Sequence, residues 1–294
     1  MALGVLTSAS GSPGVTTSAL GLALSWPRPV LLVEADPTGG SGVLAGYFHG
    51  DVAHLGGLID LALAHRDGTL TEALPLATMP IPGTGVRFLP GIRSHTQSRS
   101  LVPLWEPLTG ALRALERNGQ DVIVDAGRLG LAGCPEPLIY GSDLTLLLTR
   151  STLPALAGAR SWAQTLRTEF ERTGAASNLG VLLVGAGQPY GAREVSKVLQ
   201  IAVTASLAWD APAAEVFSRG ANPPRRFESA PLLRSLRAAG SAIAEVLNTN
   251  RASLGSTPDR NPTPNIGATA DSGATADFRT TAGSGAAPEL GRPG

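Results

Sequence analysis

The chain has 294 residues, of which 43% are hydrophobic and 16% are charged, so it is long and apolar enough to bury a substantial core. Its formal net charge is zero, which excludes a general electrostatic attraction to nucleic acid or anionic lipid, although a local patch can still provide one. The single cysteine, Cys134, excludes an intrachain disulfide, and the sequence shows neither a signal peptide nor a long apolar run, so we expect a cytoplasmic protein without membrane insertion.

Apolar runs alternate with helix-like segments over residues 1–248. The apolar runs, which we predict to be strands, are at 2–9, 29–35, 86–91, 121–126, 143–149, 178–186 and 201–209. The helix-like segments are at 16–26, 101–119, 153–174, 191–200 and 231–248. Runs that are apolar at every position are typical of strands buried on both faces of a parallel sheet. The alternation therefore predicts an α/β fold, with a doubly wound, mostly parallel sheet flanked by helices.

The composition changes near residue 249. Residues 249–294 are rich in Gly, Ala, Thr and Pro and contain almost no large apolar side chains. A segment of this kind cannot bury enough surface to offset the entropy that it would lose on ordering. We therefore predict a folded domain at 1–248 and a disordered tail at 249–294.

The stretch SASGSPGVTTSALGLAL follows the first predicted strand and begins the first predicted helix. A phosphate-binding loop occupies this position because backbone N–H groups and a helix N-terminus together form an anion site. Gly11 and Gly14 allow the backbone conformations that such a loop needs, and Thr16 and Thr17 offer one hydroxyl for Mg²⁺ and one for the helix cap. The consensus lysine is absent, and Val15 stands in its place, so a plain Gly/Ser turn remains an alternative.

Acidic side chains follow two other predicted strands. The strand PVLLVEADP ends in Glu34 and Asp36, and the strand QDVIVDAG ends in Asp125. Each carboxylate alone is explained by a turn or a helix cap. Together with the loop they are harder to explain in that way, because ligands of such sheets bind at the carboxyl ends of the strands. Carboxylates at that edge suit the positioning of a metal ion or a water molecule.

With these motifs in this order, residues 2–248 resemble the ParA/MinD family of deviant P-loop ATPases. The family combines a K-G-G-x-G-K-[ST]-[ST] loop, a D-x-D-P motif and a D-[TS]-x-x-G motif, which here read SGSPGVTT (10–17), EADP (34–37) and DAGRLG (125–130). The resemblance implies ATP and Mg²⁺ as ligands and Asp36 and Asp125 as catalytic positions. It places Thr16, Asp36 and Asp125 at the Mg²⁺ ion. It places the nucleotide against Ser10, Gly11, Ser12, Gly14, Val15, Thr16 and Thr17.

The departures from the family pattern concern positive charge. Ser10 and Val15 stand where the family has lysines, and Pro13 removes one backbone N–H from the phosphate-binding loop. Asp36 and Asp125 remain, so the acidic side of the site is kept while its cationic side is lost. We therefore expect weak ATP binding and little or no hydrolysis. Arg128, which follows Asp125, is a candidate substitute for the missing cations.

Two functions follow from these observations. The first is a cytoplasmic positioning or adaptor protein that acts with protein partners of a partition, septum-placement or pilus and secretion system and hydrolyses little or no ATP. The second is an active ATPase with an unorthodox lysine-free loop that cycles between a monomer and an ATP-bound homodimer. The arginine-rich segment 215–237, with Arg219, Arg225 and Arg226, also suits nonspecific DNA contact, against the alternative of a solvated helix face and a stiff loop.

Overall fold

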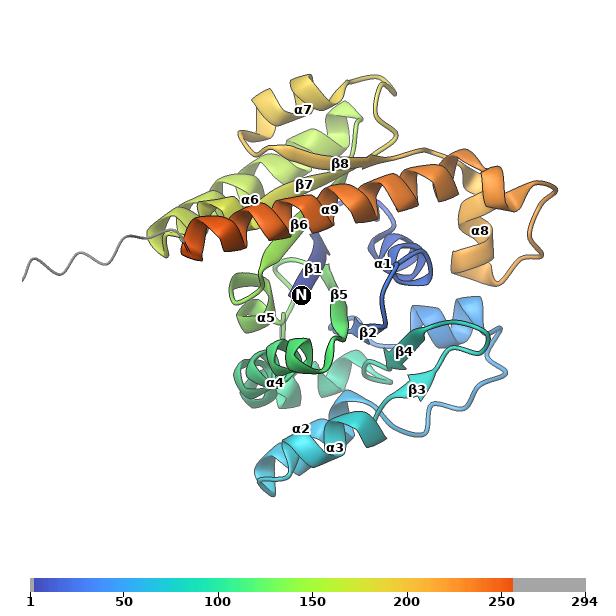
Figure 1. Ribbon diagram of the computed structural model, residues 1–294, viewed down its shortest axis with the longest axis vertical. Helices are drawn as coiled ribbons and strands as arrows, with labels where there is room; N and C mark the ends of the chain where they lie inside the picture. The colour runs from blue at the N-terminus through green and yellow to red at the C-terminus, as the bar shows by residue number, and fades with distance from the viewer. Residues whose placement is uncertain (1–2, 256–294) are drawn as a thin grey trace, which may run out of the picture. The chain divides into compact units, whose positions relative to one another are not determined.

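The computed structural model describes residues 3–255, which contain one eight-stranded sheet with the order β3-β4-β2-β5-β1-β6-β7-β8 (Figure 1). Every neighbouring pair is parallel except β3 and β4. The predicted mostly parallel α/β sheet is therefore confirmed. The strands are β1 (Leu3–Ser8), β2 (Val30–Glu34), β3 (Met79–Pro80), β4 (Val86–Leu89), β5 (Asp121–Arg128), β6 (Leu144–Arg150), β7 (Leu179–Val184) and β8 (Val203–Leu207).

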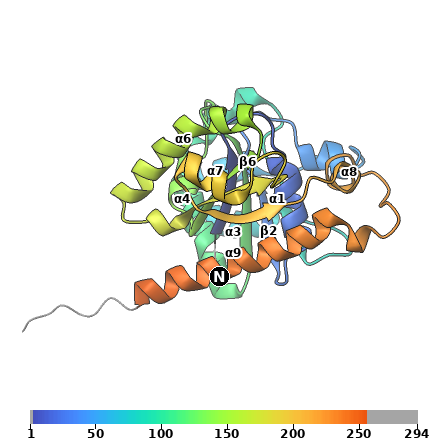
Figure 2. The same ribbon diagram turned by 90° about the horizontal axis from the view of Figure 1, so that it is seen from above.

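Helices cover both faces of this sheet, and each face has its own apolar cluster. One cluster contains side chains of α2 to α7, and the other contains side chains of α1, η1, α8 and α9. Figure 2 shows α6 and α9 on opposite sides of the strands. The α-helices are α1 (Val15–Leu24), α2 (Leu58–Arg66), α3 (Leu70–Leu76), α4 (Val102–Ala114), α5 (Glu136–Tyr140), α6 (Leu153–Arg172), α7 (Ala192–Leu199), α8 (Ala211–Arg219) and α9 (Pro231–Gly255). The short helices are η1 (Val43–Tyr47), η2 (His95–Leu101), η3 (Leu115–Asn118), η4 (Ala176–Asn178) and η5 (Phe227–Ser229).

The last helix is longer than the sequence predicts. Helix α9 continues to Gly255, past the predicted end at residue 248. The Asn250 amide Nδ2 donates to the carbonyl oxygen of Ser177 at 3.0 Å and to Oδ1 of Asn178 at 3.1 Å, so contacts with η4 support the added turns. From residue 256 onward, the predicted disordered tail lies outside the described residues. None of the helices within 3–255 has the length and apolarity that crossing a membrane requires.

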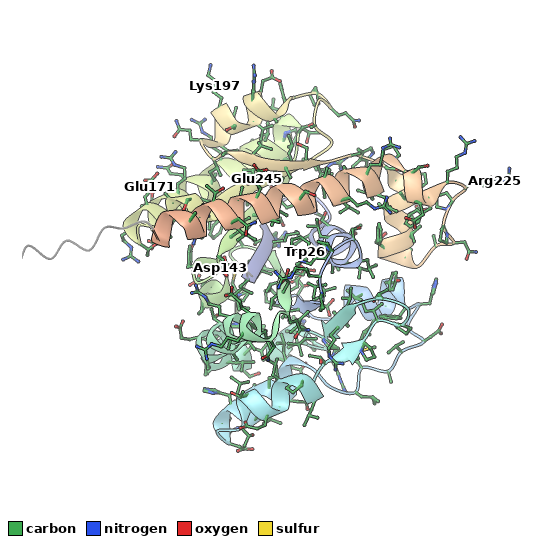
Figure 3. All side chains as sticks on the ribbon, in the orientation of Figure 1. Trp26, Asp143, Glu171, Lys197, Arg225 and Glu245 are labelled. Carbon is green, nitrogen blue, oxygen red and sulfur yellow. The ribbon has the colours of Figure 1, made fainter. Side chains whose placement is uncertain are left out.

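Two aspartates tie the amino-terminal ends of the central strands together. The Trp26 indole Nε1 donates to Oδ2 of Asp121 at 2.7 Å, which joins the end of α1 to β5. The backbone N–H of Leu3 donates to Oδ2 of Asp143 at 2.9 Å, and Arg113 donates to the other oxygen of this carboxylate. Figure 3 labels Trp26 and Asp143 near the start of β1.

Helix α8 is held against η1 by two glycines. A Cβ atom added to Gly46 would clash with the carbonyl oxygen of Ser218, and one added to Gly220 would clash with the His49 ring. Gly220 has a φ of +62° and ends α8 in the left-handed conformation that glycine adopts most readily. The backbone of α8 is therefore fixed close to η1.

We expect Gly46→Ala to destabilise the protein by about 1–3 kcal/mol, because the added methyl group meets backbone rather than a movable side-chain end. Gly110→Ala is the matched control, since nothing lies within 4 Å of its added Cβ and alanine favours the interior of α4. The control should stabilise the protein by about 0.5–1 kcal/mol. Urea unfolding of both variants measures the difference, and equal midpoints would contradict the close contact between η1 and α8.

Candidate functional site

The loop between β1 and α1 has the backbone shape of an anion site. Gly11, Ser12 and Gly14 have φ values of +76°, +43° and +95°. Helix α1 begins at Val15 without a side-chain cap, and its first turn closes when the Ser18 N–H donates to the Gly14 carbonyl oxygen at 2.9 Å. The N–H groups of the first helical turn have no partner within a helix, so they are suited to an anion.

Side chains at the two lysine positions are packed against the protein itself. Val15 is 8% exposed and belongs to the apolar cluster that also contains Leu6 and Val43. Ser10 lies against α6, because a Cβ added to Gly158 would clash with its Oγ. Neither side chain brings a positive charge to the loop.

Thr16 and Thr17 are half-buried at the start of α1. The Thr16 side chain lies against Gly42, where an added Cβ would come within 3.2 Å of its Cγ2 atom. Thr17 lines a cavity beside the loop, together with Ser12 and Gly14.

Asp125 is the most deeply buried carboxyl group at this edge. The strand register places Asp125 opposite Leu6 of β1 and opposite Glu34 of β2. Its Oδ1 accepts from the Gly127 N–H at 3.0 Å, whereas its buried Oδ2 has no well-placed donor among residues 3–255. Burial raises the pKa of Asp125 from 3.8 to about 7, the nearby Thr16 hydroxyl opposes this change, and the charges of Asp36 and Glu34 add to it.

Asp36 and Glu34 complete the acidic edge. The Asp36 carboxylate lies against Gly127, because a Cβ added there would clash with it, and its Oδ1 accepts from the Thr38 N–H at 2.8 Å. Glu34 is buried, and its Oε2 accepts from the Gly91 N–H at 3.1 Å. Burial raises the pKa of Glu34, although hydrogen bonds from Ser41 and nearby backbone N–H groups oppose the rise.

The donor set of this edge fits Mg²⁺ in part. An unpartnered carboxylate oxygen of Asp125, the Thr16 hydroxyl and the Asp36 carboxylate are hard oxygen ligands of the kind that Mg²⁺ prefers. Within the described residues no group of three or more His, Cys, Asp or Glu side chains could hold a metal ion. Mg²⁺ would therefore need water or ligand phosphate oxygens in addition to these residues.

The loop that follows Asp125 is packed under two tryptophans. An added Cβ on Gly130 would come within 2.7 Å of the Trp162 ring. The Trp105 indole Nε1 donates to the Gly133 carbonyl oxygen at 3.1 Å. The backbone is also tied to the end of β1, since the Leu129 N–H donates to the Ser8 carbonyl oxygen at 2.8 Å. Arg128 extends from this segment and is exposed.

A cavity of about 230 Å³ lies beside the loop, toward β8 and α8. Trp209 follows β8, is 49% exposed and lines the cavity, while the Arg150 guanidinium lies 3.9 Å from the centre of its ring. The lining residues are Ser12, Pro13, Gly14, Thr17, Ser18, Val184, Leu207, Ala208, Trp209, Asp210, Ala211, Ala214, Glu215, Ser218, Arg219 and Leu232. Sequence reasoning did not identify Trp209 or Arg150 as part of the site.

The three arginines proposed for DNA contact lie in two different parts of the structure. Arg219 is the last residue of α8 and lines the cavity. Arg225 and Arg226 lie in the exposed loop that follows α8, and Figure 3 shows Arg225 extending away from the body. Arg128 does not line the cavity.

No protein-family model and no curated protein matches the sequence. Solved structures do match the fold. The septum site-determining protein MinD of Pyrococcus horikoshii, complexed with Mg-ADP, has a TM-score of 0.61 and 16% identity, over 84% of this chain and 98% of that chain. A ParA family ATPase from Chlorobium tepidum has a TM-score of 0.62 and 17% identity, over 81% and 98%. This chain has the ParA/MinD fold.

A third structure with the ParA/MinD fold is the MinC:MinD cell division protein complex of Aquifex aeolicus. It matches with a TM-score of 0.63 and 14% identity, over 82% of this chain and 95% of that chain. The fold likeness covers more than four fifths of this chain in each of these structures. At this level of identity it establishes the architecture, and the roles of individual residues rest on their own geometry.

The raised pKa of Asp125 predicts a pH-dependent stability. Well below pH 3.8 this group is protonated in both the folded and the unfolded chain, so it adds no penalty. As the pH rises toward 7, only the unfolded chain ionises readily, and stability falls by at most about 4 kcal/mol. Asp125→Asn removes this dependence, so the variant should gain stability over the parent protein as the pH rises from 4 to 8.

Urea unfolding in Mg²⁺-free buffer measures this difference. Glu34 adds its own pH dependence in both proteins, and its interaction with Asp125 is part of the difference that is measured. If the free energies of unfolding of the variant and the parent change with pH in parallel, the pKa of Asp125 is not raised in the folded protein.

Proposed function

We propose that this chain is a cytoplasmic positioning or adaptor protein of ParA/MinD type whose nucleotide site is degenerate and hydrolyses little or no ATP. The observation that carries this proposal is the packing of Val15 into the core. The loop keeps its backbone shape, but no cationic side chain of its own faces a triphosphate.

The charge balance at the loop supports weak nucleotide binding. A triphosphate brings several negative charges, and Asp36 and Asp125 lie at the same edge. Loss of one cationic group at a phosphoryl-transfer site costs on the order of 10³-fold in rate or more. Pro13 also offers no N–H to the phosphates. When bound, Mg²⁺ would supply positive charge here, with Thr16, Asp36 and Asp125 as its protein ligands.

Binding of Mg²⁺ would have to displace the proton that Asp125 holds near neutral pH. Its pKa of about 7 means that the carboxyl group is only partly ionised at that pH. Cation binding at this edge is therefore proton-linked and weakens as the pH falls. This further limits a Mg²⁺-dependent reaction in mildly acidic conditions.

Protein partners are part of the proposal. The MinD of Aquifex aeolicus is seen in complex with MinC. We infer a comparable role for this chain, in which it binds a protein of a partition, septum-placement or secretion system. A homodimer is also proposed, although Ser10 lies against α6 of its own chain and would not bridge to a nucleotide in a second copy.

An active ATPase with an unorthodox loop is the alternative. In that case the Asp36 and Asp125 carboxylates position a metal ion or a water molecule, and a cation from outside the loop neutralises the phosphates. The two readings differ in a single quantity, the rate of phosphate release that depends on these carboxylates.

We expect phosphate release from ATP by the purified full chain to equal that of its Asp36→Asn variant. Release that is the same in both proteins comes from contamination or solution hydrolysis, because the substitution removes a carboxylate of the candidate metal site. A steady-state assay with Mg²⁺ and radiolabelled ATP measures both rates. Turnover that disappears in Asp36→Asn would replace the adaptor proposal with the active ATPase.

Nonspecific DNA contact through the loop after α8 is a further partner proposal. Arg225 and Arg226 are exposed, and no carboxylate of the described chain forms an ion pair with either of them. Arginines in this state are free to contact phosphates. The observation that favours DNA contact is therefore that Arg225 and Arg226 form no ion pair with a carboxylate of the described chain.

Replacing both Arg225 and Arg226 with alanine should weaken DNA binding at all sequences alike. The slope of the logarithm of the binding constant against the logarithm of salt concentration should become shallower by about 2, because two phosphate contacts are lost. Fluorescence anisotropy with a short duplex between 50 and 200 mM salt, roughly, tests this. An unchanged slope would remove these arginines from any DNA-binding surface.

A further inference from the structure

The cavity beside the loop has one source of positive charge. Of the side chains that line it, Asp210, Glu215 and Arg219 are charged. Asp210 caps α8, since its Oδ1 accepts from the Ala213 N–H at 3.3 Å and its Oδ2 from the Leu232 N–H at 3.4 Å. Arg219 is the only cation in this lining.

Arg219 combines a fixed backbone with a free side chain. It ends α8, which the close contacts at Gly46 and Gly220 hold against η1. Its side chain is 76% exposed, and its Nη1 atom is 3.4 Å from Oε1 of Glu215. An exposed pair of this length is weak and screened by salt, so the guanidinium can exchange Glu215 for another acceptor.

We propose that Arg219 supplies the positive charge for a phosphate-bearing ligand at the loop, in place of the lysines that Ser10 and Val15 do not provide. This rests on the proposed function, because it assumes that the degenerate loop still binds a ligand. The ligand class is a nucleoside di- or triphosphate or a related polyphosphate. A planar guanidinium donates hydrogen bonds to two phosphate oxygens at once, which makes arginine well suited to this task.

Glu215 acts in this arrangement as a competitor. It occupies the Arg219 guanidinium when no anion is present, and it adds negative charge to the cavity. A ligand must therefore displace this carboxylate, which lowers its affinity. Removing the charge of Glu215 should strengthen binding through the same guanidinium.

The cavity also separates Arg219 from the proposed DNA-contacting arginines. Arg219 lines the cavity with Ser12, Gly14 and Thr17, whereas Arg225 and Arg226 do not line it. Arg128, the cation that the sequence suggested as a substitute, is also outside the lining. The geometry thus favours Arg219 over each of these arginines as the partner of a phosphate at the loop.

Equilibrium dialysis of the full chain with Mg²⁺ and labelled ATP tests the proposal. Arg219→Ala should weaken ATP binding by about tenfold, as expected for the loss of one charge-assisted phosphate contact. Glu215→Gln should strengthen it severalfold. Pyrophosphate competition should weaken in the same way in Arg219→Ala, whereas competition by adenosine should be unchanged.

A matched pair on α6 provides the controls. Arg172 is likewise the last residue of its helix, is 68% exposed, and pairs with Glu169 at 2.9 Å. Arg172→Ala and Glu169→Gln change the net charge in the same way at residues that do not line the cavity, so they should leave ATP binding within about twofold of the parent protein. Circular dichroism and urea unfolding confirm that all four variants are folded.

Several results would overturn the proposal. Equal ATP affinities for Arg219→Ala and Arg172→Ala would remove Arg219 from the site, and an equal loss of adenosine binding would assign it to a non-phosphate part of a ligand. Failure of the parent protein to bind ATP or pyrophosphate would refute this inference while leaving the adaptor proposal intact. ATP turnover that Asp36→Asn abolishes would instead refute the adaptor proposal. The dialysis measurements would still decide the role of Arg219.

Discussion

Parallel pairing of β1, β5 and β2 is the constraint on which the candidate site depends. Because parallel strands end at the same edge of a sheet, the loop after β1 meets the carboxylates that end β2 and β5. The register sets Asp125 opposite Glu34, and burial of the strands removes most of the water around both groups. The acidity of this edge therefore comes from carboxylates that strand pairing brings together, and not from residues of the loop.

The backbone geometry that suits an anion and the positive charge that attracts an anion are separate properties of this loop. Gly11, Ser12 and Gly14 hold the loop in left-handed conformations, and the start of α1 supplies unpaired N–H groups. Neither feature requires a lysine. The protein can therefore keep the geometry while Val15 is incorporated into the core on that face of the sheet. In the function that we propose, such a site attracts anions weakly and takes its positive charge from other parts of the chain.

Much of this arrangement could be predicted from the sequence because it follows from local pattern. Continuous apolar runs indicate buried parallel strands, and the positions of Asp36 and Asp125 after two of those runs place them at one edge. The contact of Trp209 with Arg150 could not be predicted in this way, since it depends on the order of β6, β7 and β8. The extension of α9 past residue 248 likewise depends on contacts between Asn250 and η4. The inward packing of Val15 required knowledge of its neighbours in space, since valine at a helix start carries no signal of burial direction.

The packing of Ser10 and Val15 also bears on how this loop can change during evolution. A lysine at position 15 would have to withdraw from an apolar cluster, and the space it left would cost stability. A longer side chain at position 10 would meet α6 at Gly158 unless the helix moved or the chain turned outward. We therefore expect a lysine at position 15, or a longer side chain at position 10, to make the protein less stable. A charged loop on this framework would need compensating substitutions in the apolar cluster and in α6.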